Sequence, residues 1–380
     1  NNMDFCWTIH PAADYNFNAD SGDYETLIKK FEQVYDLGVR QFGIFYDDLD
    51  LSIADGKKHA KLINDVYQYL DEKYGDVKPF ITVTSRYNNS WGGDWVKYFT
   101  PFMKTVHPDT IVLWTGQHTM SAITKDYFET PKKKTGVDRD LGVWWNYPVT
   151  DYCYGKLLMG SLDILDTDVD NINSFFLNPM SEADASKVTI FSGADYAWNT
   201  GTFDSISSWK RSIKELVPEA HEEFERFADN ISYIDLPERK SGFKFEESQY
   251  LKEDLDKFEN ALKYGDNFKT EIANMKAKFK QMLDDVQALR KIKNKNLLSE
   301  VEKHIDAYED MAKAGIAAME GYEYALQGDI GKTIDKISEL ENALSKSGSH
   351  IIDTIKGQSY VVVGSYRITP LLEKSINNIR

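Results

Sequence analysis

The chain has 380 residues and a net charge of −16, with 42% hydrophobic and 13% aromatic residues. This length predicts two domains, or one large domain with an appendage, and the composition is typical of a large folded core. The acidic balance argues against nucleic acid or an anionic membrane as partner, because both require a basic face. Two cysteines are too few for a disulfide framework. No stretch approaches the roughly 18 apolar residues of a membrane helix.

Strand-like apolar runs alternate with helix-like segments in the first half of the chain. Several runs lie about thirty residues apart, the length of a βαβ unit. One intervening segment, Asp23–Leu37, has an apolar helical face and is followed by Gly38. The pattern predicts a parallel α/β fold, and a TIM (β/α)8 barrel in particular. A doubly wound sheet is the competitor, but no glycine-rich phosphate loop follows the first strand. The predicted strands are Phe5–His10, Gln41–Tyr46, Phe80–Thr84, Thr110–Thr115, Leu141–Trp145 and Val188–Ser192.

From Ser205 onward the apolar residues recur at helical spacing. The clearest case is Phe268–Leu289, where they recur at intervals of four and three. Strand signals are nearly absent there until Tyr360–Val363. We therefore predict a barrel domain over residues 1–240 and a helical bundle over residues 241–380. The spacing also fits a dimerising coiled coil, although packing within one chain is the commoner outcome. The oligomeric state is left open.

Asp47 and Asp48 stand side by side where the run Gln41–Tyr46 ends. A dense run of Phe, Ile and Tyr without a helical period is typical of a buried strand. Two crowded and partly buried carboxylates repel, so the pKa of at least one should be raised. A carboxylic acid that stays protonated near neutrality is what a general acid needs. The alternative is that the pair only ends the strand and caps the next helix.

Aromatic residues mixed with amides and carboxylates follow the other predicted strands. Rings cover the apolar C–H face of a sugar, while amides and carboxylates hydrogen-bond its hydroxyls in fixed directions. Singly, each cluster has an ordinary explanation: Trp114 and Trp145 suit a core, and Asn178-Pro179 suits a turn. Together, at the same end of successive strands, they predict a sugar pocket. The clusters are Thr84–Trp91, Trp114–Gly116, Trp144–Tyr152, Asn178–Met180 and Ala194–Asn199.

The motifs FYDD, RYNNSW, LWTG, WWNYPVTDY, NPMSEADASK and ADYAWN resemble those of family 84 glycoside hydrolases. They occur in the family's order between residues 3 and 240. This family consists of β-N-acetylglucosaminidases and includes O-GlcNAcase-like bacterial enzymes and secreted enzymes labelled hyaluronidases. The resemblance implies a retaining reaction in which the substrate's own 2-acetamido oxygen attacks the anomeric carbon. The intermediate would be an oxazoline, an exception to the two-carboxylate scheme of most glycosidases.

The resemblance also implies roles for particular residues. Asp47 would orient and polarise the acetamido N–H, and Asp48 would protonate the leaving oxygen and then deprotonate water. Neighbours on a strand point to opposite faces, so serving one sugar requires the backbone to turn at this pair. Seven further residues would contact the sugar: Tyr87 near the acetamide, Trp144 around its methyl group, Asn146, Asp151 and Asn178 at the hydroxyls, and Trp91 and Thr115 in the pocket wall.

The sequence departs from the family pattern at its start. Family members have two further βα units before the strand that matches Phe5–His10, and these units carry a glycine and a lysine that contact the sugar. The six predicted strands would then be six of the eight in a closed barrel. We expect the chain to be a fragment whose intact form carries both units before Asn1.

Other function classes fit less well. The seven histidines show no HxH or HExxH spacing, so we expect no metal and no cofactor. A calcium loop starting at Asp48 would have its glycine and glutamate out of place. A chitinase-type motif read from Asp47 would need acidic residues where Ser52 and Ala54 stand. The serious alternative is a catalytically silent barrel that binds N-acetylglucosamine or a glycan.

The expected partner is a glycan or glycoprotein that contains N-acetylglucosamine. The residues do not specify whether the aglycone is a protein, a mucin glycan or a glycosaminoglycan. By the resemblance we expect a secreted or cell-surface bacterial protein, although the chain shows no signal peptide.

Overall fold

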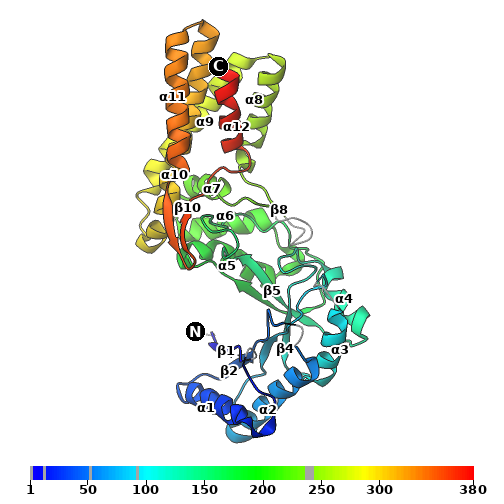
Figure 1. Ribbon diagram of the computed structural model, residues 1–380. Coiled ribbons are helices and arrows are strands. Elements are labelled where there is room, and N and C mark those ends of the chain that lie inside the picture. Colours follow the sequence, from blue (N-terminus) through cyan, green and yellow to red (C-terminus); the bar gives the residue numbers. More distant parts are fainter. Residues whose placement is uncertain (1–2, 12–13, 51–53, 91–93, 236–243) are drawn as a thin grey trace. The chain divides into compact units, whose positions relative to one another are not determined.

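The computed structural model describes residues 3–11, 14–50, 54–90, 94–235 and 244–380 (Figure 1). The chain divides into two compact units. The sheet unit contains Asn1–Asn146 and Ile164–Phe176, and the helical unit contains Tyr147–Asp163, Leu177–Leu236 and Lys244–Arg380. The predicted domain boundary at residue 240 lies outside the described residues. No helix in the described ranges is both long and apolar enough to cross a membrane.

A parallel six-stranded sheet with the order β1-β2-β3-β4-β5-β6 organises the sheet unit. Five predicted strands are confirmed with slightly different ends, and the division between the units falls within β5 and β6. The register places Cys6 opposite Gln41, and Ile81 opposite Ile111. The strands are β1 (Cys6–Ile9), β2 (Gln41–Ile44), β3 (Ile81–Val83), β4 (Ile111–Trp114), β5 (Leu141–Pro148) and β6 (Ile172–Asn178).

Four helices follow the first strands and lie along one side of the sheet (Figure 1). They are α1 (Asp23–Asp36), α2 (Gly56–Tyr74), α3 (Trp95–Thr105) and α4 (Lys125–Thr135). Phe31 of α1 packs on the sheet with ring centroids 5.5 Å from Phe42 and 5.7 Å from Phe80. All three rings are fully buried, so they form the core that holds α1 to the sheet. A Cβ at Gly43 would lie 2.5 Å from the Ile81 carbonyl oxygen, which explains why β2 has a glycine where it pairs with β3.

The predicted strand Val188–Ser192 is wrong, because these residues lie within α5 (Ala183–Trp198). Ile190 and Phe191 in this run are 42% and 37% exposed, whereas a strand that is covered on both faces would bury them. The sixth strand is instead β6, in which the polar residues Asn173 and Ser174 obscure the apolar pattern. The cluster Ala194–Asn199 therefore ends a helix and does not follow a strand. The buried residues of α5 recur at helical spacing: Ala185, Val188, Thr189, Ser192, Gly193 and Tyr196.

The C-terminal region is helical, as predicted, and Figure 1 shows α8 to α12 side by side in a bundle. A Cβ at Gly315 would lie 2.3 Å from the Phe279 ring, so this glycine lets α10 and α9 pack closely. The helices of this unit after α5 are α6 (Ser205–Leu216), α7 (His221–Asp229), α8 (Lys252–Tyr264), α9 (Phe268–Leu289), α10 (Lys295–Gln327), α11 (Ile330–Ser347) and α12 (Ile368–Ile379).

The helical unit also contains short antiparallel pairs of strands. One is β7 (Ile234–Asp235) with β8 (Lys244–Phe245), and the other is β9 (Ile351–Thr354) with β10 (Gly357–Tyr360). The predicted strand Tyr360–Val363 is wrong in its position, since only its first residue belongs to a strand. The valines that follow carry a strong apolar signal because they are buried beyond the hairpin, not because they pair as a strand.

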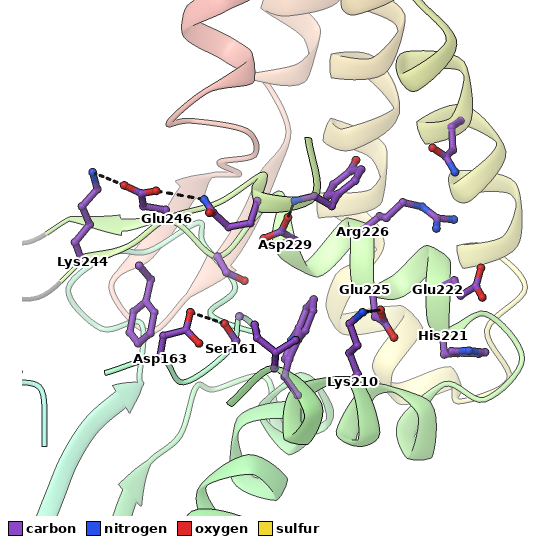
Figure 2. A pocket seen from close by; sticks show the side chains of 18 residues that line it. Ser161, Asp163, Lys210, His221, Glu222, Glu225, Arg226, Asp229, Lys244 and Glu246 are labelled. Atoms are coloured by element: carbon purple, nitrogen blue, oxygen red, sulfur yellow. Dashed lines mark hydrogen bonds and ion pairs between the residues drawn. The ribbon is translucent and has the colours of Figure 1, made fainter. Parts of the chain in front are cut away.

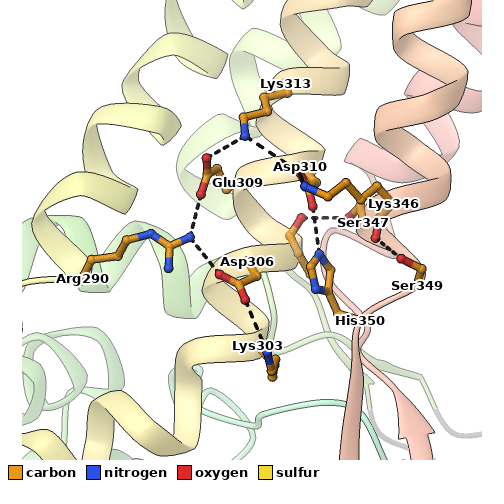
Figure 3. Close-up of polar contacts among 11 residues, drawn as sticks. Arg290, Lys303, Asp306, Glu309, Asp310, Lys313, Lys346, Ser347, Ser349 and His350 are labelled. Atoms are coloured by element: carbon orange, nitrogen blue, oxygen red, sulfur yellow. Dashed lines mark hydrogen bonds and ion pairs between the residues drawn. The ribbon is translucent and has the colours of Figure 1, made fainter.

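Charged residues tie α10 to its neighbours (Figure 3). Asp310 of α10 is buried, accepts a hydrogen bond from Lys346 Nζ at 3.1 Å and lies 2.8 Å from His350 Nε2. Arg290, which follows α9, donates to Asp306 of α10 at 2.8 Å. A buried carboxylate is costly unless a cation and hydrogen bonds satisfy it. The carboxylates of this network are therefore neutralised within the fold.

Candidate active site

The end of β2 turns at the predicted catalytic pair. Ladder hydrogen bonds continue just past the strand, from Phe45 N to Ile9 O and from Tyr46 N to Val83 O, both at 2.9 Å. Asp48 then has a φ of +54°, in the left-handed region that residues other than glycine rarely adopt. This conformation ends the strand alternation, so two neighbouring side chains are no longer forced to opposite faces. The turn that the sequence required is present.

The carboxyl of Asp47 is half-buried and that of Asp48 is exposed. Burial is the largest cause of a raised pKa at Asp47, and the Asp48 charge adds to it, while a backbone hydrogen bond and His10 oppose it. His10 Nε2 lies 2.8 Å from the Asp47 carbonyl oxygen and 3.9 Å from its Oδ1. Among the described residues, no lysine or arginine forms an ion pair with either carboxylate. The raised pKa falls on the residue that the family resemblance places at the acetamide.

Tyr87, which follows β3, connects Asp48 to the aromatic part of the site. Its phenol donates a hydrogen bond to Asp48 Oδ1 at 2.8 Å. Burial first, and then this hydrogen bond, raise the pKa of Tyr87 well above its usual range, so the phenol remains a neutral donor. The Tyr87 ring lies 6.5 Å from Trp144, and Trp144 lies 5.4 Å from Phe45. Three of the predicted site residues therefore share one part of the sheet edge.

Strand β5 presents Trp144 and Asn146 on the same face. Both are half-buried, whereas the residue between them, Trp145, is fully buried and donates from Nε1 to Ser121 O at 2.8 Å. This alternation is the expected property of a strand. Trp145 is core, as its sequence context suggested, and Asn146 is directed toward the site by a hydrogen bond from Nδ2 to Thr119 O at 2.9 Å.

The loop after β4 holds Tyr87 and Asn146 in place through hydrogen bonds. Thr115 is buried, and its hydroxyl donates to His118 O at 2.7 Å and to Tyr87 O at 3.1 Å. Thr119 accepts from Asn146 Nδ2 through its carbonyl and from Asn88 Nδ2 through its hydroxyl, the latter at 3.4 Å. Thr115 therefore holds the loop that carries Thr119 and does so through backbone groups.

Sequence reasoning missed two residues of this site, His10 and Thr119. His10 was counted only as the end of a strand, although it directly follows β1, which pairs with the strand that carries Asp47. Thr119 belongs to no recognisable motif. Its only sequence signal is that it closely follows β4, and residues just beyond the ends of parallel strands commonly form the site in α/β folds.

Three predicted sugar contacts are not tested by the geometry of this sheet edge. Asp151 and Asn178 belong to the helical unit, where Asp151 is exposed and the Asn178 carbonyl accepts from Val149 N at 2.9 Å. Their role in sugar binding stays a prediction. Trp91 lies outside the described residues.

The chemistry available at this sheet edge is that of proton exchange and hydrogen bonding. The groups at this edge are the carboxylates of Asp47 and Asp48, which have no lysine or arginine partner among the described residues, the neutral phenol of Tyr87, the amide of Asn146 and the indole of Trp144. Within the same ranges, no group of three His, Cys, Asp or Glu residues could hold a metal ion. A neutral, hydroxyl-rich ligand with an apolar face suits these groups.

Comparison with known proteins gives the family. A model of the β-N-acetylglucosaminidase family matches residues 1–229. The Protein O-GlcNAcases of Rattus norvegicus and Mus musculus are each 27% identical over 203 residues, which cover 50% of this chain and 21% of each relative. The chain thus corresponds to only a small part of the curated relatives that it matches.

Solved structures agree with this assignment. The structure of CpGH84D has a TM-score of 0.89 at 32% identity and covers 99% of this chain and 63% of that chain. For CpGH84B the TM-score is 0.84 at 27% identity, with 98% and 64% covered. A mutant of the Thermobaculum terrenum O-GlcNAc hydrolase shares the fold, with a TM-score of 0.80 at 18% identity over 99% of this chain and 79% of that chain. The chain therefore belongs to the β-N-acetylglucosaminidase family, the family 84 glycoside hydrolases.

Proposed function

We propose that the protein is a retaining β-N-acetylglucosaminidase that removes terminal β-linked N-acetylglucosamine from a protein or a glycan. The observation that carries this proposal is the left-handed turn at Asp48, which ends strand alternation where two adjacent carboxylates meet Tyr87 and Trp144. Backbone strain of this kind persists where a site requires it. The names of the relatives, O-GlcNAcase and O-GlcNAc hydrolase, support the same glycone.

In this reaction Asp47 accepts a hydrogen bond from the acetamido N–H and increases the negative charge on the acetamido oxygen. That oxygen attacks the anomeric carbon as the glycosidic bond breaks, while Asp47 takes the acetamido proton and Asp48 gives its own proton to the leaving oxygen. Asp48 then takes a proton from the water that opens the oxazoline, and Asp47 returns its proton to the nitrogen. Two inversions at the anomeric carbon give net retention.

The other residues hold the sugar. Tyr87 orients Asp48 and lies beside the acetamide, Trp144 covers the acetamido methyl group, and Asn146 binds a hydroxyl. Asp151 and Asn178 contribute further hydroxyl contacts, and Trp91 and Thr115 belong to the wall. The sequence supports these assignments through the family motifs, and the contacts of Tyr87 and Asn146 described above are consistent with them.

We also propose that the six strands belong to an eight-stranded (β/α) barrel closed by two further βα units. The sheet has two edge strands, β1 and β6, and such edges leave backbone groups unpaired. Next to β1, Met3 and Phe5 are 82% and 68% exposed, which is apolar surface that a neighbouring unit would cover. Supplying both units in cis or in trans should reduce binding of a hydrophobic dye and raise the unfolding temperature. Unchanged dye binding would contradict closure.

Turnover of a chromogenic N-acetylglucosaminide tests the main proposal. We expect release of the chromophore, with the β-anomer as the first product by NMR, and no turnover of the matched glucoside that lacks the acetamide. A bicyclic thiazoline that mimics the oxazoline should bind far more tightly than N-acetylglucosamine. An inverted product or equal activity on the glucoside would refute substrate assistance. Binding of the sugar without release would instead indicate a silent binding barrel.

A further inference from the structure

The helical unit contains a cavity of about 880 Å³ that takes no part in the proposed reaction (Figure 2). Its wall comes from α6, α7, the loop Gly160–Asp163 and the segment Lys244–Tyr250. The volume falls within the range of roughly 300–1,000 Å³ that is common for small-molecule sites. Figure 2 shows carboxylates and cations from these segments around the cavity, so their pairing decides which ligands suit it.

Each lysine and arginine of the wall already has an anionic partner. These cations therefore have little charge left to offer a ligand, since an anion would have to compete with a carboxylate that is already in place. The pairs are Lys210 with Glu225 at 3.7 Å, Lys244 with Glu246 at 3.2 Å, and Arg226 with Asp285 at 2.7 Å.

Three carboxylates of the wall, unlike its lysines and arginine, have no partner of opposite charge among the described residues. Within the described ranges, Asp163, Glu222 and Asp229 form no ion pair. Asp163 accepts hydrogen bonds from the hydroxyls of Ser161, at 2.9 Å, and Ser205, at 2.6 Å. Asp229 accepts a backbone hydrogen bond from Tyr250 N at 3.1 Å.

Asp229 shows the energetic consequence. Burial raises its pKa to about 6, backbone hydrogen bonds from Tyr250 and Gln249 oppose this shift, and the charge of Asp163 adds a smaller contribution to it. The two carboxylates therefore repel each other, and in the part of the chain that the structure describes neither forms an ion pair with a cation. A positive group placed between them would relieve both the repulsion and the loss of solvation.

Three residues supply the apolar part of a wall that also contains uncharged polar residues such as Ser232, Gln249 and Gln281. Trp209 and Phe245 are 8% and 5% exposed, and Ile206 is 47% exposed. The polar edge of Trp209 is already used, because Nε1 donates to Met159 O at 2.6 Å. With both rings nearly covered, there is no open ring face of the kind on which a sugar stacks. The cavity combines unpaired negative charge with aliphatic and ring-edge surface.

We propose that this cavity binds a small organic cation, with a primary ammonium group on an apolar chain or ring. The ammonium lies between Asp229 and Asp163, and the apolar part lies against Ile206 and Phe245. This site is independent of the proposed glycosidase reaction, so either proposal can fail without the other.

A series of three ligands of the same shape tests the charge requirement. Hexylammonium, 1-hexanol and hexanoate are titrated into the chain of residues 1–380 at neutral pH by calorimetry and by ligand-observed NMR. We expect hexylammonium to bind roughly tenfold or more tightly than 1-hexanol, because a charge-assisted contact is about twice as strong as a neutral one. Hexanoate should not bind. Equal binding of the alcohol, tighter binding of hexanoate, or no saturable binding of hexylammonium would overturn the proposal.

Matched variants test the place of binding. D229N and D163N should each weaken hexylammonium binding roughly tenfold. D195N is the control, because Asp195 lies in the same unit, pairs with Arg211 and does not line the cavity. Its affinity should equal that of the unmodified chain, which also excludes an effect of net charge alone. Equal weakening in all three variants would overturn the site. Circular dichroism establishes folding, and the exposed Asp163 keeps the test valid should D229N fold poorly.

Discussion

The aspartate pair at the edge of the sheet and two buried aspartates of the helical bundle have opposite surroundings. Asp47 and Asp48 lie on a turn beyond a short strand, beside a phenol and an imidazole. Asp285 of α9 and Asp310 of α10 lie on long helices, are 2% and 3% exposed, and are each held by a cation. The same residue type therefore contributes to function where its charge is left for a ligand, and to the fold where a partner neutralises it.

Removing the proposed acid should have the largest effect and act on chemistry alone. D48A should lower kcat/KM for a phenyl N-acetylglucosaminide about 10²- to 10⁴-fold, the usual range for losing a general acid. A dinitrophenyl substrate should lose far less in the first bond cleavage, because its leaving group departs without a proton. Rates from pre-steady-state release of the phenol measure this difference.

D48N is the matched control, because asparagine tolerates the left-handed backbone at this position. It should show the same dependence on the leaving group. Equal loss for both substrates in both variants would remove Asp48 from the acid role.

Breaking the ion pair between Arg226 and Asp285 in the helical unit should lower stability, whereas removing Asp48 should lower the reaction rate. Arg226 donates two hydrogen bonds to Asp285, at 2.9 and 2.7 Å. R226M should lower the free energy of unfolding by about 3 kcal/mol, because it leaves a buried carboxylate uncompensated. The midpoint and slope of urea unfolding give the value.

The double variant R226M/D285L separates charge from packing. Replacing both partners by apolar side chains should recover most of the stability that R226M loses. A double variant as unstable as R226M would show that packing, and not an unpaired charge, accounts for the loss.

The contrast extends to hydrogen bonds between a phenol and a carboxylate. Tyr87 donates to Asp48 in the site, and Tyr35 of α1 donates to Asp76 at 2.6 Å on the surface. Y87F should lower kcat/KM roughly tenfold, since a hydrogen bond to a charged group is worth about 1.5–3 kcal/mol. Y35F should leave the kinetics unchanged. A similar loss in both, or none in Y87F, would show that the contact with Asp48 is not used in the reaction.

The smallest predicted effect concerns pH. Asp47 must be ionised to accept the acetamido N–H, and this form is lost as pH falls through its raised pKa. The acid limb of kcat/KM on an activated substrate should therefore lie at higher pH than for an ordinary aspartate, and D47N should lack it. Because His10 lowers the pKa of Asp47, H10A should move the limb to still higher pH. A limb that persists in D47N would assign it to another group.

Much of the fold could be read from local patterns. The helix Phe268–Leu289 has the predicted ends because its apolar residues meet the bundle once per turn. The strands around Asp47 were recognised because dense β-branched and aromatic runs suit a sheet with cover on its faces. The need for a backbone turn at the Asp pair also followed from sequence, since strand alternation is a property of the chain alone.

Tertiary contacts decided the rest. Val188–Ser192 has strand-like composition, yet it is helical because the buried side of α5 recurs at helical spacing. Burial and neighbours, not the dipeptide, determined that a raised pKa falls on Asp47. Thr119 enters the site only because the loop after β4 meets the side chain of Asn146. Local patterns predicted the helices and strands. Strand pairing, burial and ion pairs involve residues that are distant in sequence, so only the packing determined which carboxylates remain available to a ligand.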